Sequence, residues 1–331
     1  MKTYLSQLVQ NQSLSKNDAY VVLSKIAAGE VNTSQMAAFL MGIQQKGITS
    51  DELSGFRDAM LDVAYKIDLS SFDAMDVCGT GGDGKDTFNI STTAAFVIAG
   101  AGQKIAKHGN HGVSSSVGSS TVLEYLGIKF TNDESYLKDK LEKTGMCYLH
   151  APLFHPAMRH VGTIRKELEM KTFFNMLGPL LNPGEVKKQL TGVYDRSVFE
   201  LYERVFRQTD NRFGIIFDLA VYDEISLTGD FMFSSHFPTA DEGELFSPSA
   251  FDLKTFKQED LHGGVSLEES AQILINILEN KGTEAQTSVV LANAALGLCV
   301  AKNLTIEQGM AEARVSLESG KAREVLRKLA S

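Results

Sequence analysis

The chain of 331 residues is 43% hydrophobic and 22% charged, a composition typical of a globular protein large enough for two core-bearing units. Its 32 basic and 41 acidic residues give a net charge of −9, which opposes the phosphate-backbone attraction that nucleic-acid-binding proteins use. The longest apolar stretch, residues 94–102, is about half the roughly 20 residues that cross a bilayer, and no secretory segment begins the chain, so we expect a cytoplasmic protein that binds neither nucleic acid nor membrane.

The first 70 residues carry helix start and stop signals. Apolar residues recur at helical spacing over 15–29, 33–47 and 49–63, and each segment opens on a serine or threonine. Thr49 and Glu52 form a capping box for the third segment. The pattern predicts a small all-α domain.

From residue 74 the pattern changes to short apolar runs, each followed by a glycine- or serine-rich loop and a helical segment, which indicates an α/β domain. The candidate strands are residues 74–78, 104–107, 146–149 and 213–217. Helices are expected over 93–101 and 121–126, and 267–329 is predicted to be mostly amphipathic helix.

A glycine-rich loop, residues 76–92, lies between the first strand and a helix. Its glycines let backbone N–H groups approach phosphate oxygens, and the next helix presents its positive end with Ser91 and Thr92 at the cap. A tight turn with no ligand remains an alternative, because glycine loops often serve only that purpose.

A second loop of the same kind, residues 107–120, follows the next strand. It has a cation at Lys107, an amide at Asn110, several serines and a helix start near Ser119. Two such loops meet at the carboxyl edge of a parallel sheet, where open α/β folds bind ligands. The pair suits a substrate with two phosphate-bearing ends, although the serines could instead be only caps and turn formers.

Three further features are ambiguous from the residues alone. Asp223 and Glu224 could both face Mg²⁺ from a loop, or form a solvated surface pair. Arg165, before an apolar stretch, is either a carboxylate clamp or a surface helix cation. The histidines fit no zinc spacing, and the cysteines at 78, 147 and 299 are expected to be buried thiols without a catalytic role.

Taken together, the chain closely resembles the anthranilate phosphoribosyltransferase family, from the capped N-terminal helices through GTGGDG, NIST and KHGN to residues 319–322. The resemblance implies transfer of the 5-phosphoribosyl group from 5-phosphoribosyl 1-diphosphate to the amine of anthranilate, a step of tryptophan biosynthesis. It also implies Mg²⁺ dependence with two ions, and a homodimer formed through the helices.

The resemblance also implies roles for individual residues. Asn110, Arg165, His108 and Gly79 would bind anthranilate, and Ser91, Asp223 and Glu224 would bind Mg²⁺. Those expected to bind the donor are Gly79, Gly82, Asp83, Thr87, Asn89, Ser91, Thr92, Lys107, Ser115 and Ser119. No side chain is expected to be an obligatory acid or base, because an aryl amine is already unprotonated at neutral pH.

The fold implied is a helical domain, residues 1–70 with a returning segment at about 163–188, beside an α/β domain, 71–162 and 189–331. A central, mainly parallel sheet of the nucleoside phosphorylase and phosphoribosyltransferase kind is expected in the second domain. The chain departs from the family at His111, where arginine is usual, and at Phe217 and Asp218, where His-Gly is usual. Alternative functions are a nucleoside phosphorylase-like enzyme and a non-enzymatic nucleic-acid-binding paralogue.

Overall fold

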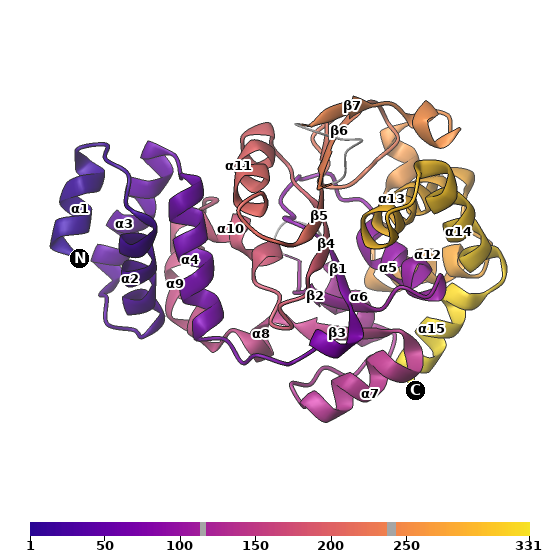
Figure 1. Cartoon of the computed structure of the whole chain (residues 1–331), viewed down its shortest axis with the longest axis horizontal. Helices are drawn as coiled ribbons and strands as arrows, with labels where there is room; N and C mark the ends of the chain where they lie inside the picture. The colour runs from indigo at the N-terminus through magenta and orange to yellow at the C-terminus, as the bar shows by residue number, and fades with distance from the viewer. Residues whose placement is uncertain (113–116, 237–242) are drawn as a thin grey trace.

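The computed structural model describes residues 1–112, 117–236 and 243–331. A helical bundle lies on one side of a sheet, and a second group of helices covers the sheet's other face (Figure 1). The N-terminus lies in the bundle and the C-terminus beside the second group (Figure 1).

The bundle begins with α1 (Lys2–Val9), α2 (Lys16–Ala27), α3 (Thr33–Lys46) and α4 (Ser50–Asp62). The start signals act as expected: Ser15 accepts the N–H of Asp18, and Thr49 and Glu52 form a capping box. Helix α1 was not among the predicted helices, and only one of its residues, Leu8, is fully buried.

The sheet has the strand order β3-β2-β1-β4-β5-β6-β7 within the described residues. The first five strands in this order are parallel, and β6 and β7 are antiparallel, which confirms the mainly parallel sheet. The strands are β1 (Met75–Gly79), β2 (Ile105–Gly109), β3 (Met146–His150), β4 (Lys188–Gly192), β5 (Arg212–Asp218), β6 (Phe231–Ser235) and β7 (Glu244–Phe246). The four predicted strands are confirmed as β1, β2, β3 and β5.

The central strand β4 was missed because its segment, KQLTG, has only one strongly apolar residue, Leu190. All five of its residues are nevertheless buried, because β4 pairs with β1 on one side and β5 on the other. Tertiary pairing therefore overrides a weak local preference here.

One face of the sheet is covered by α5 (Ile90–Gly100), α12 (Leu267–Leu278), α13 (Glu284–Lys302), α14 (Ile306–Glu318) and α15 (Lys321–Ala330) (Figure 1). The expectation of amphipathic helices is wrong for α13, which packs against α5, α14, β4 and β5 and is buried on nearly every side. By length and composition α13 could span a membrane, but 83% of its apolar window is buried inside the protein, so its composition is that of a core helix.

The remaining α-helices are α6 (Ser119–Tyr125), α7 (Glu134–Thr144), α8 (Ala151–Phe154), α9 (Arg159–Leu168), α10 (Phe174–Leu177) and α11 (Arg196–Phe206). Helix α6 packs on α12 of the second group, and α7 packs on the edge strand β3. Helix α9 packs on α2 and α3, while α11 contacts both α4 and β5. One hydrophobic core consequently runs from the bundle, through Phe199 and Phe206 of α11, to Phe213 and Ile215 of β5.

Candidate active site

A single cavity of about 1140 Å³ lies where β1 and β2 end, between the sheet and α9. It is lined by every predicted site residue that the structure describes, namely Gly79, Gly82, Asp83, Thr87, Asn89, Ser91, Thr92, Lys107, His108, Asn110, Ser119, Arg165, Asp223 and Glu224. Ser115 lies outside the described residues.

The glycine-rich loop leaves β1 at Gly79 and enters α5 at Ile90. Gly81, Gly82 and Gly84 all have positive φ, between 66° and 83°, so the loop needs the conformations that glycine adopts at little cost. Asn89, not Ser91 or Thr92, is the N-cap of α5; the latter two lie in the first turn, a correction to the expected cap.

Asp223 and Glu224 sit directly on the ends of β1 and β4, not on an exposed surface. A Cβ at Gly79 would lie 2.2 Å from Asp223 Oδ2, and one at Gly192 would lie 1.5 Å from the Asp223 carbonyl oxygen. Only glycine at both strand ends therefore leaves room for this pair. Asp223 is 9% exposed and Glu224 is partly buried, so the solvated-pair alternative does not hold.

The two carboxylates accept hydrogen bonds from the glycine-rich segment. The N–H of Gly81 donates to Asp223 Oδ2 at 2.6 Å, and the N–H of Ser91 donates to Glu224 Oε1 at 2.7 Å. Burial raises the pKa of both carboxyl groups, and charge repulsion from Asp83 on Asp223, and from Asp223 on Glu224, raises the pKa further.

This cluster fits a hard divalent cation. A cation would offset both the repulsion and the cost of burying charge, and carboxylate, hydroxyl and phosphate oxygens are what Mg²⁺ prefers. Among the described residues no group of three His, Cys, Asp or Glu side chains could hold a metal by itself. Mg²⁺ commonly takes one or two carboxylates and completes its shell with water and substrate phosphate, so the pair is sufficient.

The second loop is tied to the first. Asn89 Nδ2 donates to the Val117 carbonyl at 3.1 Å, and Lys107 Nζ donates to the Val77 carbonyl and lies 3.5 Å from Ser91 Oγ. Lys107 lines the cavity and is only 2% exposed, so solvent screens its charge only weakly there. The Ser119 hydroxyl bonds to the Tyr148 hydroxyl at 2.9 Å, at the start of α6.

The far wall of the cavity comes from the chain between β3 and β4. Arg165 on α9 is partly buried, its guanidinium lies 5.4 Å from the Phe174 ring, and burial lowers its pKa. Within the described residues this guanidinium forms no ion pair, and Arg165 lines the cavity. It is therefore a cation that faces the cavity and not a surface helix cation. An incoming carboxylate is its natural partner.

Two buried histidines face each other beside this wall. The rings of His108 and His155 are 5.2 Å apart in an edge-to-face arrangement, and His155 Nε2 donates to the Leu181 carbonyl at 2.8 Å. Burial lowers the pKa of His108 to about 3 and that of His155 to about 4. Both rings are therefore neutral at physiological pH and cannot supply a cation.

Sequence reasoning assigned no role to two residues that line the cavity, His155 and Lys171. Lys171 Nζ donates to the Gly82 carbonyl at 2.5 Å and lies 4.0 Å from the Tyr194 ring, so it reaches from the α9 side to the glycine-rich loop. No local pattern around Lys171 marks this contact, because its partner is 89 residues away.

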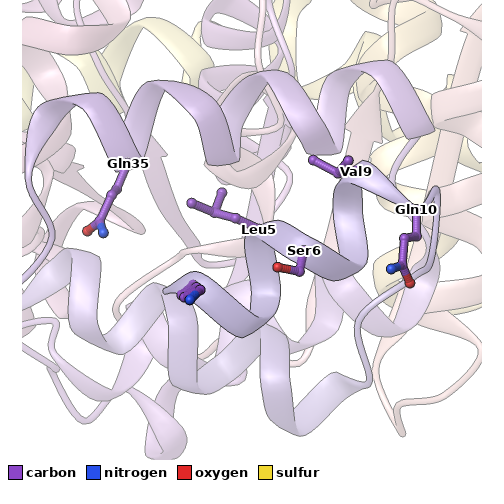
Figure 2. Close-up of a pocket in the computed structure, with 6 residues that line it drawn as sticks. Leu5, Ser6, Val9, Gln10 and Gln35 are labelled. Atoms are coloured by element: carbon purple, nitrogen blue, oxygen red, sulfur yellow. The ribbon is translucent and has the colours of Figure 1, made fainter.

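The departures at His111, Phe217 and Asp218 leave the cavity formed. The His111 ring contacts Thr121 Oγ1 at 3.1 Å and packs 5.0 Å from His150, while Phe217 and Asp218 are buried at the end of β5. A smaller hollow of about 490 Å³ lies elsewhere, on the bundle (Figure 2). It is lined by Lys2, Leu5, Ser6 and Val9 of α1, by Gln10 directly after α1, and by Gln35 of α3 (Figure 2).

Known proteins match along the whole chain. Residues 71–323 match the glycosyl transferase family α/β domain and residues 2–64 its helical bundle domain. The anthranilate phosphoribosyltransferases of Flavobacterium johnsoniae and Christiangramia forsetii are 50% and 48% identical to the chain, each over 99% of this chain and 98% of the relative.

Solved structures agree. Anthranilate phosphoribosyltransferase from Thermus thermophilus has a TM-score of 0.92 at 30% identity, covering 99% of this chain and 98% of that one. The Saccharomyces cerevisiae enzyme in complex with PRPP and Mg has a TM-score of 0.90 at 27% identity, covering 99% and 96%. The same enzyme in complex with 4-fluoroanthranilate has a TM-score of 0.88 at 27% identity, covering 99% and 95%.

The neutral state of the two histidines is testable by pH titration. Because the folded pKa values of His108 and His155 lie below the unfolded value of about 6.5, the stability that these rings contribute is complete above pH 6.5 and declines as the pH falls toward 4. We expect the ¹³Cε1 NMR signals of both rings, assigned with His108→Gln and His155→Gln, to stay constant from about pH 8 to 5. An inflection near pH 6.5 would contradict their burial.

Proposed function

We propose that this chain, which belongs to the anthranilate phosphoribosyltransferase family, transfers the 5-phosphoribosyl group of 5-phosphoribosyl 1-diphosphate to the amine of anthranilate. The observation that carries the proposal is one cavity with two chemically different ends. Anion-receptive loops and a carboxylate pair form one end, and Arg165 with two neutral imidazoles forms the other. The matched relatives and solved structures are anthranilate phosphoribosyltransferases, so they do not favour a nucleoside phosphorylase-like enzyme or a nucleic-acid-binding paralogue.

At the donor end, the glycine-rich loop, the start of α5 and Lys107 would hold phosphate oxygens. The N–H groups of Thr80 and Gly81 are already bonded to the Gly192 carbonyl and to Asp223, so other donors of the loop would serve. The proposed donor contacts are Gly79, Gly82, Asp83, Thr87, Asn89, Ser91, Thr92, Lys107, Ser115 and Ser119. As diphosphate leaves the ribose C1 with its negative charge, the buried Lys107 and the loop donors stabilise that charge in place.

We propose that Asp223, Glu224 and Ser91 hold Mg²⁺ at the donor's diphosphate, with two ions bound. The metal, when bound, neutralises charge on the departing diphosphate. The raised pKa of both carboxyl groups and the yeast relative solved with PRPP and Mg support this proposal.

At the acceptor end, Arg165 would hold the anthranilate carboxylate while Asn110, His108 and Gly79 border the amine. The relative solved with 4-fluoroanthranilate supports an aromatic carboxylate as acceptor. The chain contributes position and electrostatics, with no obligatory acid or base, because His108 stays neutral and an aryl amine already has a free lone pair. We propose that this reaction belongs to tryptophan biosynthesis and takes place in the cytoplasm.

A fluorescence assay tests the overall proposal. Anthranilate fluorescence should fall when 5-phosphoribosyl 1-diphosphate and Mg²⁺ are added together to the protein, and not when either is omitted. Unchanged fluorescence with folded protein would remove the proposal.

Removal of the carboxylate pair tests the metal assignment. The double variant Asp223→Asn, Glu224→Gln should lose about 10²-fold or more in kcat/KM, because Mg²⁺ contributes several kcal/mol and each 1.36 kcal/mol is tenfold. Excess Mg²⁺ should restore part of the rate. Full activity at limiting Mg²⁺ would show that the pair holds no metal.

Arg165→Ala tests the acceptor clamp. A charge-assisted contact to a carboxylate is worth about 1.5 to 3 kcal/mol, so kcat/KM for anthranilate should fall roughly 10- to 150-fold. The KM for the donor should change little, because Arg165 lies on the far wall of the cavity. A rise in the donor KM with the anthranilate KM unchanged would refute the assignment.

We also propose a homodimer formed through the helical domain, whose limits we place at 1–70 with the segment at about 163–188. Val9 of α1 is 88% exposed beside the hollow in Figure 2, and Met41 of α3 is 39% exposed, so both apolar side chains are available for such a contact. Light scattering should give twice the chain mass of 36.1 kDa, and Val9→Glu with Met41→Glu should shift it toward the monomer. A monomeric parent protein would contradict this.

A further inference from the structure

The loop that carries Asp223 and Glu224 is closed by one buried carboxylate. Asp218, at the end of β5, is 0% exposed. Its Oδ1 accepts the N–H of Ala220 at 2.8 Å, and its Oδ2 accepts the N–H of Ser226 at 3.0 Å and the Ser226 hydroxyl at 2.6 Å. One side chain therefore joins the residues before and after the metal-binding pair.

A second buried polar side chain holds the residue next to Glu224. Asn293, 3% exposed in the buried helix α13, accepts the N–H of Ile225 through Oδ1 at 3.1 Å and donates to the Ile225 carbonyl through Nδ2 at 2.8 Å. This two-point contact fixes both the position and the orientation of the backbone immediately after the pair.

The loop conformation needs such support. Val221 has φ of 69°, a region that a β-branched residue rarely adopts, and its side chain is 45% exposed, so packing does not hold it there. Its N–H instead donates to the Asp218 carbonyl oxygen at 2.8 Å. In addition, the adjacent carboxylates of the buried Asp223 and the partly buried Glu224 repel each other and favour moving apart.

We infer that Asp218 and Asn293 are positioning residues for the divalent-cation site of Asp223 and Glu224. They act by holding the loop backbone, so that both carboxylates face the glycine-rich segment before a cation arrives. The inference rests on the proposed metal role of Asp223 and Glu224. Neither Asp218 nor Asn293 is among the described residues that line the cavity, so neither is placed to touch substrate.

Two variants remove the contacts separately. Asp218→Asn keeps the shape of the side chain but leaves an NH₂ group opposite either the Ala220 N–H or the Ser226 N–H, so one contact becomes donor against donor. Asn293→Ala leaves the N–H and carbonyl of Ile225 without their side-chain partner in an apolar interior.

The measurement is the binding of Mn²⁺ in the presence of inorganic diphosphate, followed by the electron paramagnetic resonance signal of free Mn²⁺. Each variant should bind Mn²⁺ about 10- to 100-fold more weakly than the parent, the range typical of removing outer groups that orient metal ligands. The Mg²⁺ concentration for half-maximal activity should rise in parallel, while the KM for anthranilate should stay near the parent value.

A rescue variant and a matched control separate positioning from loss of stability. Val221→Gly in the Asp218→Asn protein removes the steric cost at positive φ and should restore part of the lost Mn²⁺ affinity. Ser316→Ala removes a similarly buried hydrogen bond, from Ser316 Oγ to the Val97 carbonyl at 2.6 Å, on the far side of α5. It should leave Mn²⁺ affinity unchanged even if its melting temperature falls.

The reference is the Asp223→Asn, Glu224→Gln protein. If the parent binds Mn²⁺ no more tightly than this reference, the proposed metal site itself fails. If the parent does bind more tightly, parent-like affinity in Asp218→Asn and Asn293→Ala would overturn the positioning role. Equal loss of affinity in Ser316→Ala would also overturn it, because stability alone would then explain the effect.

Discussion

The site depends on the close approach of the Asp223 backbone and carboxylate to the ends of two neighbouring parallel strands. Gly79 ends β1 and Gly192 ends β4, and a Cβ at either position would collide with Asp223. Because glycine has no side chain at position 79 or 192, the carboxylates of Asp223 and Glu224 can accept the N–H groups of Gly81 and Ser91. The carboxylates are thereby held against the loop in which phosphate would bind.

That arrangement explains the charge distribution of the cavity. Carboxylates gathered on one wall are costly when buried, and their raised pKa values express this cost. A divalent cation held by the carboxylates would reduce this cost and allow diphosphate to bind beside them. On the opposite wall Arg165 faces the cavity beside the Phe174 ring and neutral histidines, so an anionic aromatic acceptor would meet a cation and aromatic rings there.

The two walls belong to parts of the chain that are joined by specific polar contacts. Asn182 donates to the buried Asp76 carboxylate at 2.8 Å and to the Ala106 carbonyl at 2.9 Å, which connects the segment after α10 to β1 and β2. Lys171, between α9 and α10, donates to the carbonyl of Gly82. Movement of the segment that carries Lys171 would therefore displace the glycine-rich loop.

The sequence by itself determined the capped helices, four of the strands, the two anion-receptive loops and, through its resemblance to a family, the residues that meet in the cavity. These features are local, because a cap, a glycine turn or an apolar strand acts within a few residues. Only the tertiary structure decided that β4 is central, that α13 is enclosed, and that Asp223 and Glu224 are buried. It also showed which groups Asn293 and Lys171 contact, because their partners lie 68 and 89 residues away in the chain and such proximity leaves no periodic mark in the sequence.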